Sequence, residues 1–103
     1  MGTKKLRVPA NAVHPGEILR EEFMVPMKLT SAELARQLHV SVPRVNDVVR
    51  QRRAVTADTA MRLSRYFGTS ARFWMNLQAE YDLNVAQANA ADLRKIKPRK
   101  TAA

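Results

Sequence analysis

Four side chains of the kinds that recognise DNA bases lie close together near the middle of the chain. They are Arg44, Asn46, Asp47 and Arg50. In the major groove of DNA, arginine bonds guanine, asparagine bonds adenine, and aspartate accepts a hydrogen bond from cytosine. If Val45, Val48 and Val49 face inward on a helix, the polar residues face outward or lie on its flanks. The segment therefore predicts a helix that reads bases.

Residues around this segment fit contacts to the DNA backbone. Ser41 is placed to cap the helix, and Pro43 lies in the first turn, where its missing N–H costs no helical bond. Arg52 and Arg53 follow the helix, where they would hold phosphates. Ser31 begins the preceding predicted helix. The full predicted DNA-binding set is Ser31, Ser41, Pro43, Arg44, Asn46, Asp47, Arg50, Arg52 and Arg53.

The alternative to a DNA surface is a solvated helix face whose charges pair internally, as Asp47 and Arg50 could at i,i+3. The distribution of charge favours DNA. Residues 36–72 hold eight arginines and two acids, whereas residues 17–33 hold four acids and two basic residues. The whole chain has 18 Lys and Arg against nine Asp and Glu, a net charge of +9. This balance predicts a polyanionic partner, with nucleic acid ahead of an anionic membrane surface.

Helix start signals are frequent along the chain, whereas strand signals are nearly absent. The clearest is the capping box Thr30-Ser31-Ala32-Glu33, in which Thr30 and Glu33 each satisfy a free backbone N–H. Further starts are predicted at His14-Pro15 and after Ser41, Thr56 and Ser70. We therefore predict five helices, at about residues 15–26, 31–38, 42–51, 57–67 and 71–90.

The second and third predicted helices have the apolar pattern of a helix-turn-helix pair. Leu34 and Leu38 face the core, small Ala35 allows close approach of the next helix, and Val40 fills the turn. The turn position usually needs a left-handed backbone, and His39 tolerates it better than most residues. We predict one domain over residues 14–90, between a flexible basic arm at 1–13 and a basic, disordered tail at 91–103.

Several motifs together resemble the HigA family of antitoxins, within the Xre class of helix-turn-helix proteins. They are HPGEIL at 14–19, LA at 34–35, TADTA at 56–60, FGTS at 67–70 and FWMNLQ at 73–78. The resemblance covers roughly residues 12–83. It departs from the family at His39 and Gln51, where glycine is usual.

The resemblance implies an all-α, five-helix domain of the Xre or lambda-repressor-like type. Such a protein binds double-stranded operator DNA as a dimer and represses its own operon. It also neutralises a HigB-like toxin, a ribosome-dependent mRNA-cleaving ribonuclease of the RelE type. Two alternatives stay open: a stand-alone Xre-type repressor with no toxin, and an interaction protein whose main role is to mask a partner.

An aromatic-rich stripe lies along one face of the last predicted helix. At helical spacing such a stripe is more often core than interface. In so small a domain, however, one face with three aromatic residues exceeds what the core needs. We therefore predict that part of the stripe forms a two-fold dimer contact, matching a palindromic operator. The residues are Phe73, Trp74, Leu77 and Tyr81, extended by Leu83 and Val85.

Acidic residues gather near the start of the domain. Glu17 and Glu33 serve helix starts, but Glu21 and Glu22 have no such role. A toxin that acts on mRNA should be basic, so we predict that Glu21 and Glu22 contact it through charge complementarity.

Other functional classes find little support in the sequence. There is no cysteine, and the two histidines, His14 and His39, match no metal-binding spacing, so we predict no metal and no cofactor. Three glycines offer no phosphate-binding loop, and no catalytic set is recognisable, so we predict that the protein is not an enzyme. The sequence also holds no apolar run that could span a membrane, and we expect a cytoplasmic protein.

Overall fold

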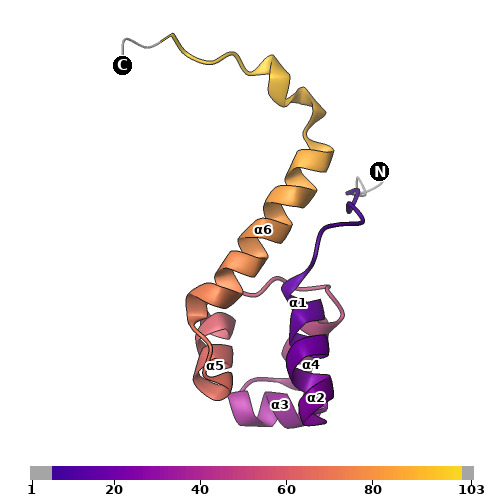
Figure 1. Cartoon of the computed structure of the whole chain (residues 1–103), viewed down its shortest axis with the longest axis vertical. Helices are drawn as coiled ribbons and strands as arrows, with labels where there is room; N and C mark the ends of the chain where they lie inside the picture. Colours follow the sequence, from indigo (N-terminus) through magenta and orange to yellow (C-terminus); the bar gives the residue numbers. More distant parts are fainter. Residues whose placement is uncertain (1–5, 101–103) are drawn as a thin grey trace.

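The computed structural model describes residues 6–100, and all its regular elements are helical. No strand occurs among the described residues, so the predicted all-α fold is confirmed (Figure 1). The elements are α1 (Pro15–Ile18), η1 (Leu19–Met24), α2 (Val25–Met27), α3 (Ser31–Leu38), α4 (Val42–Val49), α5 (Ala57–Phe67), α6 (Ala71–Asn89) and η2 (Ala91–Lys95).

The first three elements form one continuous helix with a wider π-helical turn, η1, in its middle. The helix that we predicted to end at Pro26 ends one residue later, at Met27. The π turn precedes the proline: the N–H of Val25 donates to the carbonyl of Arg20, five residues back. This wider turn separates the proline ring from the preceding carbonyls, so that the helix continues past it.

Side-chain caps begin the helices where the sequence predicted them. The capping box is confirmed: the N–H of Glu33 donates to Thr30 Oγ1 at 3.1 Å, and the N–H of Thr30 donates to Glu33 Oε1 at 2.9 Å. The hydrogen bond from the Thr30 backbone is the main cause that holds the pKa of Glu33 below its usual range. Equivalent caps are made by His14, Ser41, Thr56 and Ser70.

Three helices end in a left-handed residue that is not glycine: Lys28, His39 and Gln51, with φ of 56°, 58° and 63°. The prediction for His39 is confirmed. Helix α4 ends at Val49, because Gln51 already occupies the left-handed position that follows a helix. Its N–H donates to the Val48 carbonyl at 2.9 Å, and the N–H of the next residue, Arg52, donates to the Asp47 carbonyl at 2.8 Å. These two bonds form a Schellman motif, so Gln51 has the conformation that glycine usually adopts there.

A single apolar core lies between the helices. Gly16 allows α1 to pack directly on α4, since a Cβ at this position would lie only 1.8 Å from the Val48 carbonyl oxygen. Trp74 is fully buried, and its indole N–H donates to Thr69 Oγ1 at 2.7 Å. The largest fully buried side chains are Trp74, Leu19, Leu34, Leu63, Val48, Val55 and Pro15.

The far end of α6 projects from the helical body, and the N-terminal arm lies beside it (Figure 1). The radius of gyration is 16.9 Å, compared with roughly 13 Å for a compact domain of this length. The arm is held at Arg7. The backbone N–H of Arg7 donates to Asn89 Oδ1 at 2.8 Å, and Asn89 Nδ2 donates to the backbone carbonyl of Arg7 at 2.7 Å. The part of the predicted arm before Leu6 lies outside the described residues.

The tail that we predicted to be disordered contains a short 3-10 helix, η2. Asp92 lies in its first turn, and Arg94 and Lys95 lie in its last, an order that suits the helix dipole. Residues 96–100 follow without helical structure, and all side chains from 91 to 100 are exposed. Charge at the two helix ends therefore favours local structure within an otherwise solvated segment.

Candidate nucleic-acid interface

Helices α3 and α4 form the predicted helix-turn-helix pair, joined by the turn at His39, Val40 and Ser41. Leu34, Leu38 and Val40 pack in the common core, so the two helices are held at a fixed angle. The N-terminal end of α3 meets the middle of α4 where Ser31 Oγ donates to Asn46 Oδ1 at 3.5 Å. This contact places Ser31 and Asn46 on one surface, as the predicted DNA-binding set requires.

The outward side of α4 is polar and rigidly held. Val45 and Val48 are buried, whereas Pro43 and Arg50 are exposed. Asp47 is half-buried and pairs with Arg53 at 3.3 Å, rather than with Arg50 as the internal-pairing alternative supposed. The guanidinium of Arg50 has no ion-pair partner within residues 6–100, so it can approach a phosphate or a base.

Arg20 belongs to the same surface, although sequence reasoning missed it. A shallow hollow beside the end of α4 is lined by Arg20, Asn46, Val49, Arg50, Gln51 and Arg52. Arg20 comes from η1, within a segment of the chain that is mainly acidic. Only the packing of the first helix against α4 brings it here, and no local motif marks it. Its guanidinium pairs with Glu21 at 3.0 Å, on the exposed side of η1.

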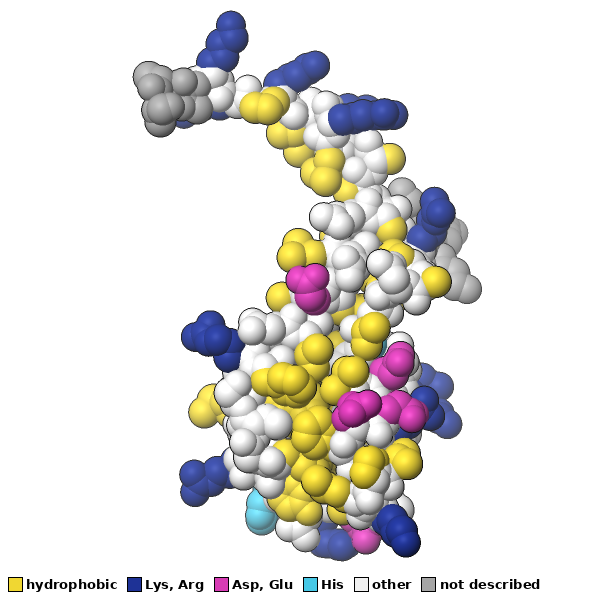
Figure 2. All heavy atoms as spheres, in the orientation of Figure 1, with side chains coloured by type: hydrophobic (Ala, Val, Ile, Leu, Met, Phe, Trp, Pro, Cys, Tyr) yellow, Lys and Arg dark blue, Asp and Glu magenta, His cyan; other side chains and the backbone are white. Residues whose placement is uncertain are grey.

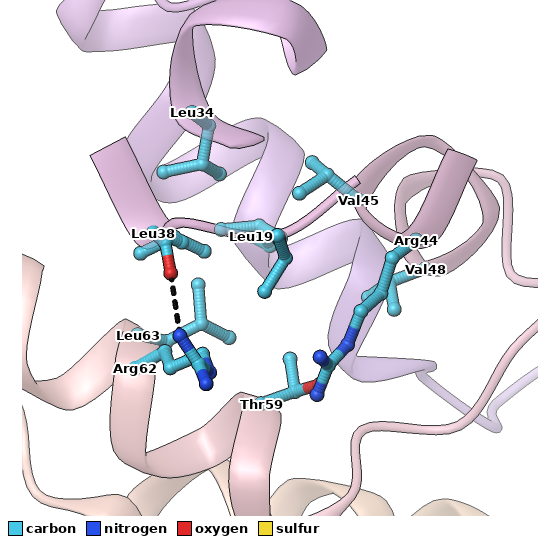
Figure 3. Close-up of a pocket in the computed structure, with 10 residues that line it drawn as sticks. Leu19, Leu34, Leu38, Arg44, Val45, Val48, Thr59, Arg62 and Leu63 are labelled. Atoms are coloured by element: carbon cyan, nitrogen blue, oxygen red, sulfur yellow. Dashed lines mark hydrogen bonds between the residues drawn. The ribbon is translucent and has the colours of Figure 1, made fainter. Parts of the chain in front are cut away.

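Arg44 lies on the flank of α4 that faces α5, not toward solvent. Its guanidinium points toward Thr59, and Nε and Nη2 donate to Thr59 Oγ1 at 3.3 and 2.9 Å (Figure 3). Nη2 also bonds the Asp58 carboxylate. Asp58 also accepts from Arg62 Nε at 2.9 Å. The hydrogen bonds from Arg62 and then Arg44 hold the pKa of Asp58 below its usual range. In this structure, therefore, the Arg44 guanidinium is committed to α5.

The predicted dimer residues on α6 are mostly used within the single chain. Trp74 is fully buried and offers no surface to a partner, so the prediction that it contacts one was wrong. Phe73 packs edge-on against Trp74 but keeps 37% of its surface exposed. Tyr81 packs against the ring of His14, with centroids 4.8 Å apart, and Leu77 packs against the core. Of the stripe, Phe73 therefore keeps the most surface for a partner, and its role in a dimer contact stays a prediction.

The extension of the predicted dimer contact divides in the same way. Val85 is buried, whereas Leu83 is 57% exposed on the projecting part of α6. The predicted toxin residues lie on η1: Glu21 pairs with Arg20, and Glu22 is exposed. Figure 2 shows a hydrophobic area on one face of the helical body with acidic side chains beside it, while Lys and Arg stand at its edges and along the tail.

Two further structural findings concern other functions. Across residues 6–100 there is no group of three or more His, Asp or Glu side chains arranged to hold a metal ion. Among the helices described, none is both long and apolar enough to cross a membrane.

Comparison with known proteins agrees with this geometry. Residues 19–74 match the model of the helix-turn-helix family, a range that includes α3, the turn and α4. The pair of crossed helices with an exposed polar second helix is the feature that defines this class of protein.

Individual relatives give a narrower assignment. The chain is 51% identical to Virulence-associated protein I of Dichelobacter nodosus, over 87% of this chain and 83% of that protein. The structure of the Pseudomonas aeruginosa antitoxin HigA with the higBA promoter is similar, with a TM-score of 0.82 and 52% identity over 85% of this chain and 98% of that one. Antitoxin GraA in complex with its operator gives a TM-score of 0.83 and 42% identity, over 95% of this chain and 100% of that one. The chain belongs to the HigA family of helix-turn-helix proteins.

Proposed function

We propose that this protein is the antitoxin of a type II toxin–antitoxin module. It binds operator DNA as a dimer, represses its own operon and neutralises a HigB-like, mRNA-cleaving toxin. The observation that carries the proposal is the exposed polar side of α4, held on a rigid helix pair. Related proteins of known structure with this fold have been solved with a promoter and with an operator.

The proposed DNA surface has two kinds of residues. Asn46, Asp47 and Arg50 on α4 would meet base edges, with Ser31 supporting Asn46 across the helix pair. The other members, Ser41, Pro43, Arg52 and Arg53, would position the protein on phosphates and sugars. Arg20 would join them from η1. Because these contacts neutralise phosphates, binding should weaken steeply as salt rises.

Fluorescence anisotropy with a duplex from the protein's own promoter tests this proposal. If the dimer neutralises about six or more phosphates, raising salt from about 50 to 200 mM should lower affinity by roughly a thousandfold or more. Replacing Arg52 with alanine should weaken binding to every duplex alike, whereas Asn46→Ala should also relax the preference at one base pair. Arg72→Ala, a loss of an exposed charge on α6, is the matched control.

A flat response to salt, or equal affinity for a scrambled duplex, would refute operator recognition.

Light scattering with and without the duplex tests the oligomeric state. We propose that the dimer contact uses the projecting part of α6 with Leu83, together with the exposed edge of Phe73. Light scattering should give twice the monomer mass, and Leu83→Glu should lower it. A monomer mass that does not increase on adding the promoter duplex would refute the dimer.

Neutralisation of a toxin needs a separate test. We propose that Glu22, exposed on η1 beside the Arg20–Glu21 pair, contacts a basic toxin surface. Co-expression with a RelE-like toxin encoded beside this gene should restore growth, and Glu22→Lys should weaken the rescue. Glu80→Lys, an exposed change on α6, is the control. Equal rescue by Glu22→Lys would exclude this contact, and no rescue by the unaltered chain would leave a stand-alone repressor.

A further inference from the structure

The TADTA motif at 56–60 lies opposite the start of α4 and connects both helices of the helix-turn-helix pair to α5. Asp58 bonds Arg44 of α4, and it also accepts from Arg62 on its own helix. Arg62 Nη1 in turn donates to the carbonyl of Leu38, the last residue of α3, at 2.9 Å (Figure 3). One carboxylate therefore links the end of α3 to the beginning of α4. We name Arg44, Asp58, Thr59 and Arg62 the α5 clamp.

The clamp holds Arg44 firmly. Thr59 is buried at 8% exposure, and its hydroxyl accepts from two nitrogens of the Arg44 guanidinium. The Arg44 side chain itself keeps only 25% of its surface exposed. To reach a base, Arg44 would have to leave both acceptors, and the buried Thr59 hydroxyl would keep only its 3.3 Å bond from the Thr56 hydroxyl. Giving up these charge-assisted hydrogen bonds has a free-energy cost, so reading a base through Arg44 is disfavoured.

The clamp also has a mechanical consequence for α4. This helix has only eight residues, and two buried valines, Val45 and Val48, anchor it in the core. Bonds at Arg44, in its first turn, fix the N-terminal end of the helix, where Val42 is exposed and does not anchor it. Side chains that read bases must be held within a fraction of an ångström, which requires a rigid supporting layer behind them.

From these contacts we infer that Asp58 is a positioning residue for DNA recognition, and that Arg44 acts through Asp58 and Thr59 to orient α4 rather than by reading a base. This inference rests on the proposed operator binding. It changes the role predicted for Arg44 and assigns a function to the TADTA motif beyond capping α5.

A double-mutant cycle tests the inference, with the full-length protein, a promoter duplex and a scrambled duplex. Asp58→Asn and Arg44→Met should each lower promoter affinity about tenfold, and the double variant should lose less than the two single losses combined, because both single variants remove the same Arg44–Asp58 bond. Thr59→Val, which removes only the hydroxyl, should lower it by a smaller factor. No variant should change which base pairs are preferred.

Two exposed residues of α6 provide charge-matched controls. Glu80→Gln removes one negative charge, as Asp58→Asn does, and Arg72→Met removes one positive charge, as Arg44→Met does. For the scrambled duplex, Asp58→Asn and Arg44→Met should each match its control, since non-specific affinity follows net charge. Circular dichroism at the assay temperature confirms that each variant is folded, and the folded Thr59→Val protein decides the matter if Asp58→Asn unfolds.

A base-reading Arg44 predicts the opposite result for one variant. Asp58→Asn would then release the guanidinium and raise promoter affinity, while Arg44→Met would lower it and alter the preference at a single base pair. Either finding overturns the inference, as does unchanged promoter affinity of folded Thr59→Val. If the unaltered protein does not distinguish promoter from scrambled duplex, the proposed function and this inference fail together. If Asp58→Asn raises promoter affinity, the inference alone is overturned.

Discussion

The Gly16→Ala substitution should destabilise the protein more than its small size suggests. Gly16 lies in α1 where this helix crosses α4, and a Cβ there would lie 1.8 Å from the Val48 carbonyl oxygen and 2.8 Å from its carbon. Real Cβ atoms essentially never approach another atom within 3.0 Å. Accommodating the methyl group therefore requires the two helix backbones to separate by more than an ångström.

The atom that opposes the new methyl group cannot move aside. The Val48 oxygen accepts the N–H of Gln51 in the bond that ends α4, so its position is fixed by the backbone. Overpacking a core costs about 1–3 kcal/mol when side chains can adjust, so we expect about 3 kcal/mol here. For a domain of this size, that loss corresponds to a melting temperature roughly 12–24 °C lower.

Thermal and urea denaturation followed by circular dichroism measure this effect, with Gly68→Ala as the control. Gly68 has a φ of 80°, but a Cβ at this position would meet no atom within 4 Å, so alanine there costs backbone strain and no clash. That strain is worth about 1 kcal/mol, a shift of roughly 4–8 °C. If Gly16→Ala is no more damaging than Gly68→Ala, the close packing of α1 on α4 is incorrect.

Three further changes test other parts of the fold. Gln51→Gly should raise the free energy of unfolding by about 0.5–1 kcal/mol in urea titrations, because glycine adopts the left-handed backbone without strain; no gain would argue against that conformation. Burial lowers the pKa of His14 from 6.5, so as pH falls through 6.5 the unfolded chain takes up the proton first. Stability present at pH above 6.5 should therefore decrease as the pH falls below 6.5, as His14 Nδ1 loses its 2.8 Å bond from the Gly16 N–H, and His14→Asn should lack this decrease. Gln78→Leu should cost about 1–3 kcal/mol, because the buried N–H of Val55 donates to its side chain at 2.7 Å and would lose its acceptor; an exposed Gln87→Leu change should alter stability by less than about 0.5 kcal/mol.

Local signals in the sequence predicted most of the helix boundaries. A cap depends on one side chain and the N–H groups two or three residues later, so Thr30 and Ser41 identify their helices without knowledge of the fold. The left-handed turn at His39 was likewise predictable, because the intrinsic tolerance of histidine agrees with what the helix pair demands. Elements whose geometry depends on near neighbours are therefore accessible to sequence reasoning.

Features that depend on distant contacts were not predictable in the same way. The helix runs one residue past Pro26, to Met27, and the π turn that precedes this proline has no signal in the sequence. Helical periodicity placed Trp74 on an aromatic face but could not say that the core would take it completely. The same periodicity placed Arg44 on a flank of α4, yet its partners Asp58 and Thr59 come from another helix. The candidate site was thus predicted as a set of residues, and its internal roles needed the tertiary structure.

The bonds between Arg7 and Asn89 join residues 82 positions apart, and they bear on the order in which the fold is completed during synthesis. The ribosome makes Arg7 before the helical body and Asn89 after it. Arg7 therefore has no Asn89 to bond while the helical body is being made. The two hydrogen bonds that hold Arg7 can form only after the chain has reached Asn89. A chain that stops earlier would contain the helix-turn-helix pair and leave the arm unbound, so this contact distinguishes a finished α6 from an interrupted one.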